Sequence, residues 1–224
     1  MTSKNPKTST DKTGDIPVNA HLLTTPGCAH CVALKKILEK LLTEGKIGPL
    51  DITDVSDHPE IAGKYGVKSV PWLQLGSFQF QGRLTEKELR QWVDNCHSPD
   101  GNTRYMKHLL EHGELNQVIG RVREDPRQLV DLLSLVTDEE QDFKVRLGVS
   151  AVFEEFQGSD ILQATLNELA DLARHEKPQV RADAAHFLAL SHSAAALPYL
   201  QRLAKDQDRE VREIAEEALT PSSE

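Results

Sequence analysis

Residues 18–31, VNAHLLTTPGCAHC, join a strand pattern to a helix pattern and contain two of the three cysteines. The opening residues, 18–24, are largely apolar and predict a β-strand. Pro26-Gly27 ends the strand, and the apolar residues that follow Cys31 recur at helical spacing, which predicts a helix. Cys28 and Cys31 therefore stand about one helical turn apart, at the point where a strand passes into a helix.

The residues up to 96 continue to alternate between strand and helix patterns. Thr85, with Glu88 three positions later, forms the capping-box pattern that opens a helix towards Cys96. Further expected elements are a strand at 50–55, a short helix capped by Ser56 or Asp57 and ending at Tyr65, an extended segment at 67–75 and a strand at 78–80. The resulting order, β-α-β-α-β-β-α, predicts an α/β sandwich.

The remainder of the chain reads as helical. Residues 97–103 (HSPDGNT) are turn formers without apolar side chains, so they predict a linker between two domains. Apolar residues at helical spacing then form three stripes: Leu162, Leu166, Leu169 and Ala173; Val180, Ala184, Phe187 and Leu188; and Val211, Ile214, Ala215, Ala218 and Leu219. We therefore expect an all-α second domain.

A Val-Arg pair opens three helical segments of this second domain. The pairs begin at Val145, Val180 and Val211, so they stand 35 and 31 residues apart. A helical unit repeated at such a period is typical of a stacked solenoid, because neighbouring units must cover each other's apolar faces. We expect the three arginines to stabilise the repeats through ion pairs, with a binding site as the alternative reading: Arg146, Arg181 and Arg212.

Charge is distributed unevenly along the 224 residues. The net charge is −9, and residues 99–224 carry 14 basic and 24 acidic side chains, a net charge of −10. Binding of nucleic acid needs clustered Lys and Arg, so we expect no nucleic-acid partner. Residues 1–16 contain little to bury and predict a disordered leader. The predicted domains are an α/β domain at 17–98 and an all-α domain at 99–224.

Cysteine usage and the N-terminal sequence favour a reducing compartment. Three cysteines do not make a disulfide framework. Residues 1–17 lack the apolar segment of a secretion signal, and no apolar run is long enough to cross a membrane, so we expect a cytoplasmic protein without a membrane partner.

A zinc site at the CxxC pair is an alternative to redox chemistry, but it would need two more ligands. The adjacent Cys96 and His97 lie far along the fold. We expect no metal and no other cofactor, because no ligand spacing is recognisable among His21, His58, His108, His112, His175, His186 and His192.

Residues 18–96 resemble the thioredoxin/glutaredoxin superfamily, in particular its short members without an extra N-terminal strand and helix. The resemblance is carried by Cys28-Ala29-His30-Cys31 after the first strand and by Val70-Pro71 before the third. It implies a cis bond at Val70-Pro71, beside the cysteine pair, and a substrate groove formed by Val70 and Pro71. Trp72 follows them as part of the same docking surface or, alternatively, of the core.

Two positions depart from the thioredoxin pattern. Thioredoxins usually carry Trp before the first cysteine and a buried Asp six positions upstream, where this chain has Gly27 and Leu22. Residues 126–219 resemble HEAT-type repeats, most clearly at Val180-Arg181-Ala182-Asp183-Ala184-Ala185. That second resemblance implies a helical-repeat domain that docks a protein partner.

Thiol–disulfide exchange needs an attacking thiolate and a second thiol that resolves the mixed disulfide. Cys28 precedes a helix, whose free N–H groups and positive end lower the pKa of a thiol, so we expect Cys28 to attack and Cys31 to resolve. His30 is expected to stabilise the thiolate and raise the reduction potential, and Ala29 completes the dipeptide that tunes the pair. Cys96 is expected to be a half-buried helix-end cysteine, with a second redox thiol as the alternative.

Three functions fit these patterns. The leading hypothesis is a thiol–disulfide oxidoreductase that acts on protein thiols or disulfides and whose helical repeats select the partner. The alternative is an interaction scaffold in which the thioredoxin-like domain is a redox-sensitive or docking module. A dedicated carrier of electrons or sulfur is the third.

Overall fold

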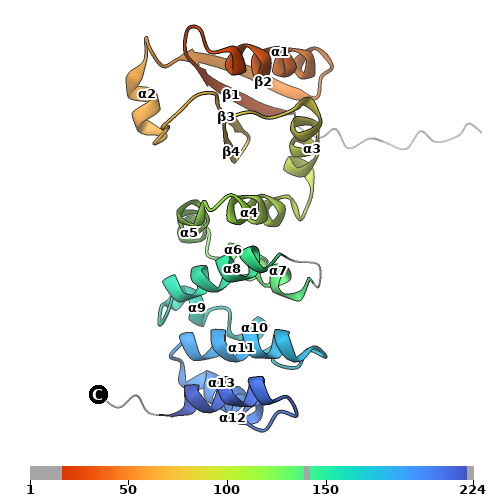
Figure 1. Ribbon diagram of the computed structural model, residues 1–224, viewed down its shortest axis with the longest axis vertical. Helices are drawn as coiled ribbons and strands as arrows, with labels where there is room; N and C mark the ends of the chain where they lie inside the picture. The colour runs from red at the N-terminus through yellow and green to blue at the C-terminus, as the bar shows by residue number, and fades with distance from the viewer. Residues whose placement is uncertain (1–16, 139–141, 221–224) are drawn as a thin grey trace, which may run out of the picture. The chain divides into compact units, whose positions relative to one another are not determined.

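The computed structural model describes residues 17–138 and 142–220, and the chain divides after Gly101 into two compact units (Figure 1). The predicted leader at 1–16 lies outside the described residues. No helix in the described part of the chain is long and apolar enough to cross a membrane.

The first unit is an α/β domain with the predicted element order. Its elements are β1 (Val18–Thr24), α1 (Ala29–Thr43), β2 (Ile47–Asp54), α2 (Pro59–Lys64), β3 (Trp72–Leu75), β4 (Phe78–Gln81) and α3 (Glu86–His97). The strands form one sheet in the order β2-β1-β3-β4 (Figure 1). β1 pairs parallel with β2 and antiparallel with β3, and β4 extends the sheet antiparallel to β3.

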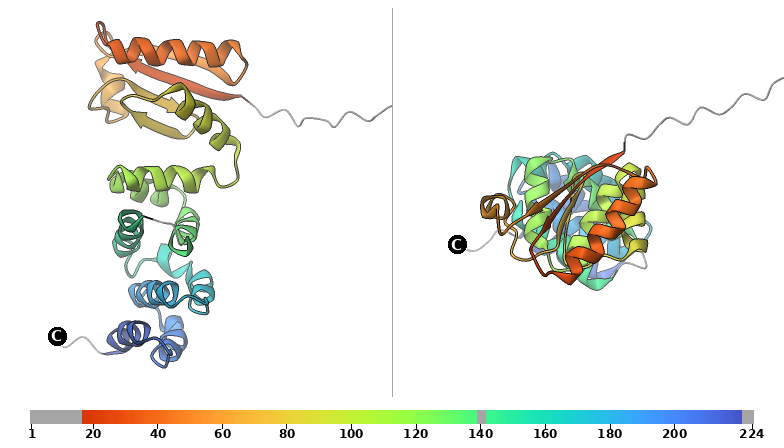
Figure 2. Two further views of the ribbon diagram at one scale, coloured as in Figure 1. Left: turned by 45° about the vertical axis from the view of Figure 1, so that its right-hand side comes forward. Right: turned by 90° about the horizontal axis from the view of Figure 1, so that it is seen from above.

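The core of this unit lies between the sheet and its helices. The register places Leu22 between Ile52 on β2 and Leu73 on β3, and both Leu22 and Leu73 are fully buried. α1 packs against β1 and β2, and α3 packs against β3 (Figure 2). The helices contribute buried Leu34, Leu38, Leu41, Leu89 and Val93.

Polar contacts fix α3 beside α1. The capping box predicted at Thr85 is confirmed. The Thr85 hydroxyl accepts from the Glu88 N–H, and the Thr85 N–H donates to Glu88 Oε2 at 2.7 Å. Lys40 of α1 pairs with Glu86 of α3 at 2.8 Å, and Glu44 pairs with Arg90 at 2.7 Å.

The second unit is built from helices alone over the described residues 102–138 and 142–220. The helices are α4 (Gly101–Glu111), α5 (Leu115–Glu124), α6 (Gln128–Asp131), α7 (Leu133–Thr137), α8 (Phe143–Glu155), α9 (Asp160–Gln163), α10 (Leu166–Leu172), α11 (Pro178–Leu190), α12 (Leu197–Leu203) and α13 (Arg209–Leu219), with a 3-10 turn, η1 (Ala194–Ala196), before α12. They stack in successive layers (Figures 1 and 2).

The Val-Arg repeats open α8, α11 and α13, as predicted. Val145, Val180 and Val211 are all buried near the first turn of their helices. Asp142 and Asp208 cap two of these helices, because their side chains accept main-chain N–H groups. The middle helix, α11, starts without a side-chain cap and has Pro178 at its first position instead.

The repeat arginines link successive layers. Arg146 of α8 pairs with Asp183 of α11, and Arg181 of α11 pairs with Asp206, which precedes α13. The expected ion pairs are therefore present at two of the three positions. The third arginine, Arg212, donates to the main-chain oxygens of Asp206 and Gln207 at 2.7 and 3.0 Å.

Three local expectations were wrong. The linker is shorter than 97–103, because α3 continues to His97 and α4 starts at Gly101. Neither Ser56 nor Asp57 caps α2, which starts at Pro59. The apolar stripe from 162 to 173 is divided between α9 and α10, where the hydroxyl of buried Thr165 donates to the Leu162 oxygen at 2.8 Å.

Candidate active site

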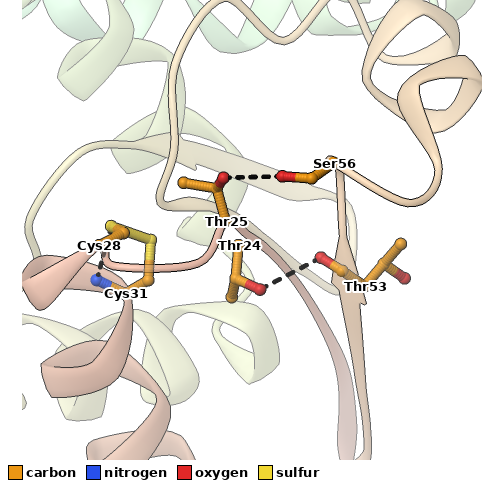
Figure 3. The surroundings of a disulfide bond; sticks show 6 residues. All are labelled: Thr24, Thr25, Cys28, Cys31, Thr53 and Ser56. Atoms are coloured by element: carbon orange, nitrogen blue, oxygen red, sulfur yellow. Dashed lines mark hydrogen bonds between the residues drawn. A yellow bond between two sulfur atoms is a disulfide. The ribbon is translucent and has the colours of Figure 1, made fainter.

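Cys28 and Cys31 form a disulfide at the start of α1 (Figure 3). Cys28 is the N-cap residue of the helix, and its Sγ accepts a hydrogen bond from the Cys31 N–H at 3.1 Å. The expected position of Cys28 at the helix N-terminus is therefore confirmed. An N–H group and the positive helix end both face this sulfur, and both stabilise a thiolate when the pair is reduced.

The two sulfurs differ in accessibility. The Cys31 side chain is 2 % exposed, and it lies in the first turn of α1. Cys28 is half-buried, and its neighbours Gly27, Ala29 and His30 are exposed. A substrate disulfide can therefore reach Cys28 more readily than Cys31.

Hydrogen bonds hold the loop that precedes Cys28 against the end of β2. Thr25 and Ser56 share a bond between their hydroxyl oxygens at 2.9 Å, and Thr24 donates to the Thr53 oxygen at 3.4 Å (Figure 3). The Val55 N–H donates to the Thr24 oxygen at 2.9 Å. The loop is thus tied on its β2 side through both its side chains and its backbone.

Gly27 occupies a left-handed backbone conformation directly before Cys28. Its φ is +76°, and a Cβ added there would meet no heavy atom within 4 Å. Conformation rather than space therefore favours glycine at this position. This geometry gives a physical reason for the departure from the Trp that thioredoxins usually carry there.

The Val70–Pro71 peptide bond is cis, as the resemblance implied. The Pro71 oxygen accepts from the Gly82 N–H at 2.8 Å, which ties this segment to the end of β4. Pro71 is buried and Val70 is half-buried. Their role in substrate binding stays a prediction.

Trp72 lies in the core rather than on a docking surface. Its side chain is 4 % exposed, and its ring packs against Tyr65 with the centroids 4.9 Å apart and edge-on against His21 at 6.4 Å. The core-packing alternative therefore describes Trp72 better than a place in the substrate groove.

Comparison with known proteins agrees with this geometry. Residues 18–94 match the thioredoxin domain family model, and residues 129–220 match that of HEAT repeats. A thioredoxin of Methanocaldococcus jannaschii is 31 % identical over 74 residues, which cover 32 % of this chain and 87 % of the relative. The chain belongs to the thioredoxin family. It is a thioredoxin domain fused to HEAT repeats.

The position of the usual buried acid in this thioredoxin domain is occupied by Leu22. The side chain is fully buried in the central strand of the sheet. A leucine accepts no proton, so this residue cannot assist deprotonation of Cys31.

Cys96 is the third cysteine of the thioredoxin domain, and it is half-buried near the end of α3. Its Sγ donates to the Leu75 oxygen at 3.7 Å, and burial raises the pKa of the thiol to about 11. It is therefore protonated at neutral pH. The structure fits the expected half-buried helix-end cysteine better than a second redox thiol.

The HEAT repeats carry a groove that the sequence did not indicate. It has a volume of about 360 Å³ and is lined by residues of α8, α11 and α13, including Phe143, Leu147 and Ile214. Phe143 is 77 % exposed and Leu147 is 58 % exposed, although both are large and apolar. Acidic Glu154, Asp183 and Glu210 line the same groove, together with Arg146.

The charge of this groove is set by its carboxylates. Arg146 pairs with Asp183, and His186 lies 3.6 Å from Glu154. Burial raises the pKa of Asp183 in spite of its pairing with Arg146. The groove therefore combines exposed apolar side chains with a surplus of acidic ones. A single sequence could not reveal it, because the lining residues come from three repeats.

Proposed function

We propose that this protein is a thiol–disulfide oxidoreductase that exchanges electrons with a protein partner through Cys28 and Cys31. In the reductive direction, the Cys28 thiolate attacks one sulfur of the partner disulfide, and the other partner sulfur leaves as a thiolate. The Cys31 thiolate then attacks Cys28 Sγ, which releases the first partner sulfur. The partner disulfide is thereby reduced to two thiols, and Cys28–Cys31 is oxidised to a disulfide. The reverse sequence oxidises a partner dithiol.

One observation carries this proposal: Cys28 Sγ is the accessible sulfur and accepts the N–H of Cys31 at the N-terminus of α1. The same N–H is available to the thiolate in the reduced state. Cys31 lies buried one turn into the helix, which suits a thiol that meets only the mixed disulfide. The three cysteines support a reducing cytoplasm as the place of action.

We further propose that the groove across α8, α11 and α13 docks the partner. The exposed side chains of Phe143 and Leu147 offer apolar contacts, and truncation of such central apolar contacts commonly weakens an interface. The acidic lining and the net charge of −10 in residues 99–224 favour a partner segment with basic residues. The occupant is thus expected to carry an apolar anchor flanked by Lys or Arg.

Trapping the mixed disulfide tests the redox proposal. A reduced Cys31→Ser chain, mixed with a peptide that contains one disulfide, should accumulate a covalent adduct at Cys28 that mass spectrometry detects. Cys28→Ser is the matched control and should accumulate little adduct. If both variants react only at Cys96, the pair is not redox-active, and the interaction scaffold becomes the better description.

A second experiment tests the groove separately from the chemistry. A labelled peptide with Lys and Arg around one Phe should bind the full chain by fluorescence anisotropy, and the same peptide with Glu for Lys and Arg should not. Leu147→Ser should weaken binding about tenfold, or about 1.4 kcal/mol, which is the size of effect expected when one of the few anchor residues of an interface is truncated. Leu197→Ser is the control, because Leu197 is 44 % exposed and is absent from the groove lining. Equal loss in both variants would contradict the assignment of the groove.

A further inference from the structure

The last turn of α4 and the residue after it place three metal-binding side chains together. His108, Glu111 and His112 each offer one ligand atom, and these atoms lie within 4.8 Å of one another. Residues three and four apart lie on the same face of a helix, which explains the grouping. The rings of His108 and His112 lie with their centroids 4.1 Å apart.

The ring of His112 has the orientation of a metal-binding histidine. Its Nδ1 lies 2.8 Å from the main-chain oxygen of His108. A carbonyl oxygen only accepts, so Nδ1 carries the hydrogen, and in the neutral ring Nε2 is left with its lone pair. Ligating histidines commonly donate their second ring N–H to a carbonyl in this way, which fixes the tautomer.

The electrostatics of this helix end favour a cation. α4 ends at Glu111, so the negative end of the helix dipole lies at this point, and the Glu111 carboxylate adds a full negative charge. Lys144 of α8 contacts the main-chain oxygen of Glu111, so one cation already lies at this end of the helix. Lys144 donates to the backbone and not to the carboxylate or the imidazoles.

We propose that His108, Glu111 and His112 form a binding site for Zn²⁺ in the helical-repeat unit. Two imidazole nitrogens and one carboxylate oxygen are ligands that Zn²⁺ accepts, and three protein ligands leave a fourth position for water or another donor. At Zn–ligand distances of about 2.0–2.1 Å, the ligand atoms must approach to about 3.3 Å. Glu111 and His112 are exposed, so their side chains can rotate to close the site.

This site is separate from the cysteine pair. In the oxidised chain, Cys28 and Cys31 are joined in a disulfide and bind no zinc as thiolates. Cys96 is protonated at neutral pH because burial raises the pKa of its thiol to about 11. Zinc binding by the oxidised full-length protein therefore reports on the histidine site.

Isothermal titration calorimetry of the oxidised full-length protein with ZnCl₂ tests the proposal. We expect one Zn²⁺ per chain, and His112→Ala should weaken the affinity by at least tenfold, because even second-shell changes cost about 10–100-fold. His58→Ala is the matched control, since the His58 side chain is 58 % exposed and lies in the thioredoxin domain. The absence of binding, or equal affinity in wild type and His112→Ala, would overturn the proposal.

A pair of glutamate variants separates coordination from general charge attraction. Glu111→Gln and Glu114→Gln remove the same charge from neighbouring exposed positions, but only Glu111 belongs to the ligand group. Glu111→Gln should weaken zinc binding, and Glu114→Gln should leave it within about twofold. Equal weakening by both variants would show that zinc is attracted by charge alone, and the proposed coordination by Glu111 would be wrong. Circular dichroism of each variant verifies that the helices persist.

Discussion

Arg181 and Asp206 form a bidentate ion pair between consecutive layers of the helical repeats. Nε donates to Oδ2 and Nη2 to Oδ1, both at 2.8 Å, and the side chains are 8 % and 12 % exposed. Arg181 also donates to the main-chain oxygens of His175 and Glu176 at 2.9 and 2.8 Å. One guanidinium thus joins α11, the turn before it and the turn before α13.

Replacing this arginine should destabilise the protein strongly. Arg181→Ala removes the guanidinium partner of the Asp206 carboxylate and of two carbonyl groups, and breaking a buried pair costs about 3–5 kcal/mol. Arg174→Ala is the control, because Arg174 and Asp171 form a pair at 3.0 Å with side chains 55 % and 80 % exposed. Its loss should cost less than about 1 kcal/mol. Urea unfolding measures both, and equal costs would contradict the role of Arg181.

The two aspartates that pair with repeat arginines should lose different amounts of stability on substitution, because their pKa values are shifted in opposite directions. The hydrogen bonds from Arg181 and the Asp208 N–H hold the pKa of Asp206 below its ordinary value, whereas burial raises the pKa of Asp183. Asp206→Asn should therefore cost about 1–3 kcal/mol at neutral pH. Asp183→Asn should cost less, because the ionised form of Asp183 is disfavoured in the folded state.

The pH dependence of unfolding separates these two cases. The folded pKa of Asp206 is lowered, so its stabilisation is full above the unfolded pKa and is lost as pH falls through the folded value. The stability difference between wild type and Asp206→Asn should then shrink below about pH 4. For Asp183 the sign is reversed, and wild type should lose stability relative to Asp183→Asn as pH rises through the raised pKa. Parallel pH profiles for the two variants would refute the opposite shifts.

Cys28 should be the first cysteine to react with iodoacetamide in the reduced protein. It is the more exposed member of the pair, and its sulfur faces the N-terminus of α1, which favours the thiolate. Peptide mapping after labelling at neutral pH should find Cys28 modified before Cys31 and Cys96. Faster labelling of Cys31 would reverse the roles of attacking and resolving thiol.

His30→Ala should make the pair more reducing. A charge or hydrogen bond from the exposed His30 side chain in the first turn of α1 is expected to stabilise the Cys28 thiolate and so the reduced state, and its loss should lower the reduction potential by roughly 10–30 mV. Equilibration with glutathione buffers measures the potential, and His58→Ala should leave it unchanged. An unchanged reduction potential in His30→Ala would show that the His30 side chain points into solvent and does not interact with the Cys28 thiolate.

Local sequence patterns predicted the elements whose hydrogen bonds are themselves local. The capping box at Thr85 needs only Glu88, three positions away. The Val-Arg pairs likewise mark the first turns of α8, α11 and α13, within a few residues of each helix start. The prediction for α2 was wrong because Ser56 bonds to Thr25, and its N–H donates to Asp54 at 2.8 Å. A tertiary contact thus competes for the residue that would otherwise cap the helix.

The candidate sites, too, were predictable from the sequence only where their residues are close together in the chain. The cysteine pair was predictable because its two members are three residues apart. The groove at Leu147 joins three repeats, and nothing at one position signals it. The cluster of His108, Glu111 and His112 has a local signal, since its i, i+3, i+4 spacing fits one helix face, but this spacing indicates a ligand group only for residues already assigned to a helix.

The hydrogen bond from Cys96 to the Leu75 oxygen makes this thiol a reporter of local opening. A protonated, half-buried sulfur reacts slowly with an alkylating reagent, and separation of α3 from β3 would break its hydrogen bond and raise its labelling rate. The alkylation rate of Cys96 therefore measures how often this part of the thioredoxin domain opens locally. Measured with the Cys28–Cys31 pair oxidised and then reduced, this rate reports whether the redox state of the pair changes how often α3 separates from β3.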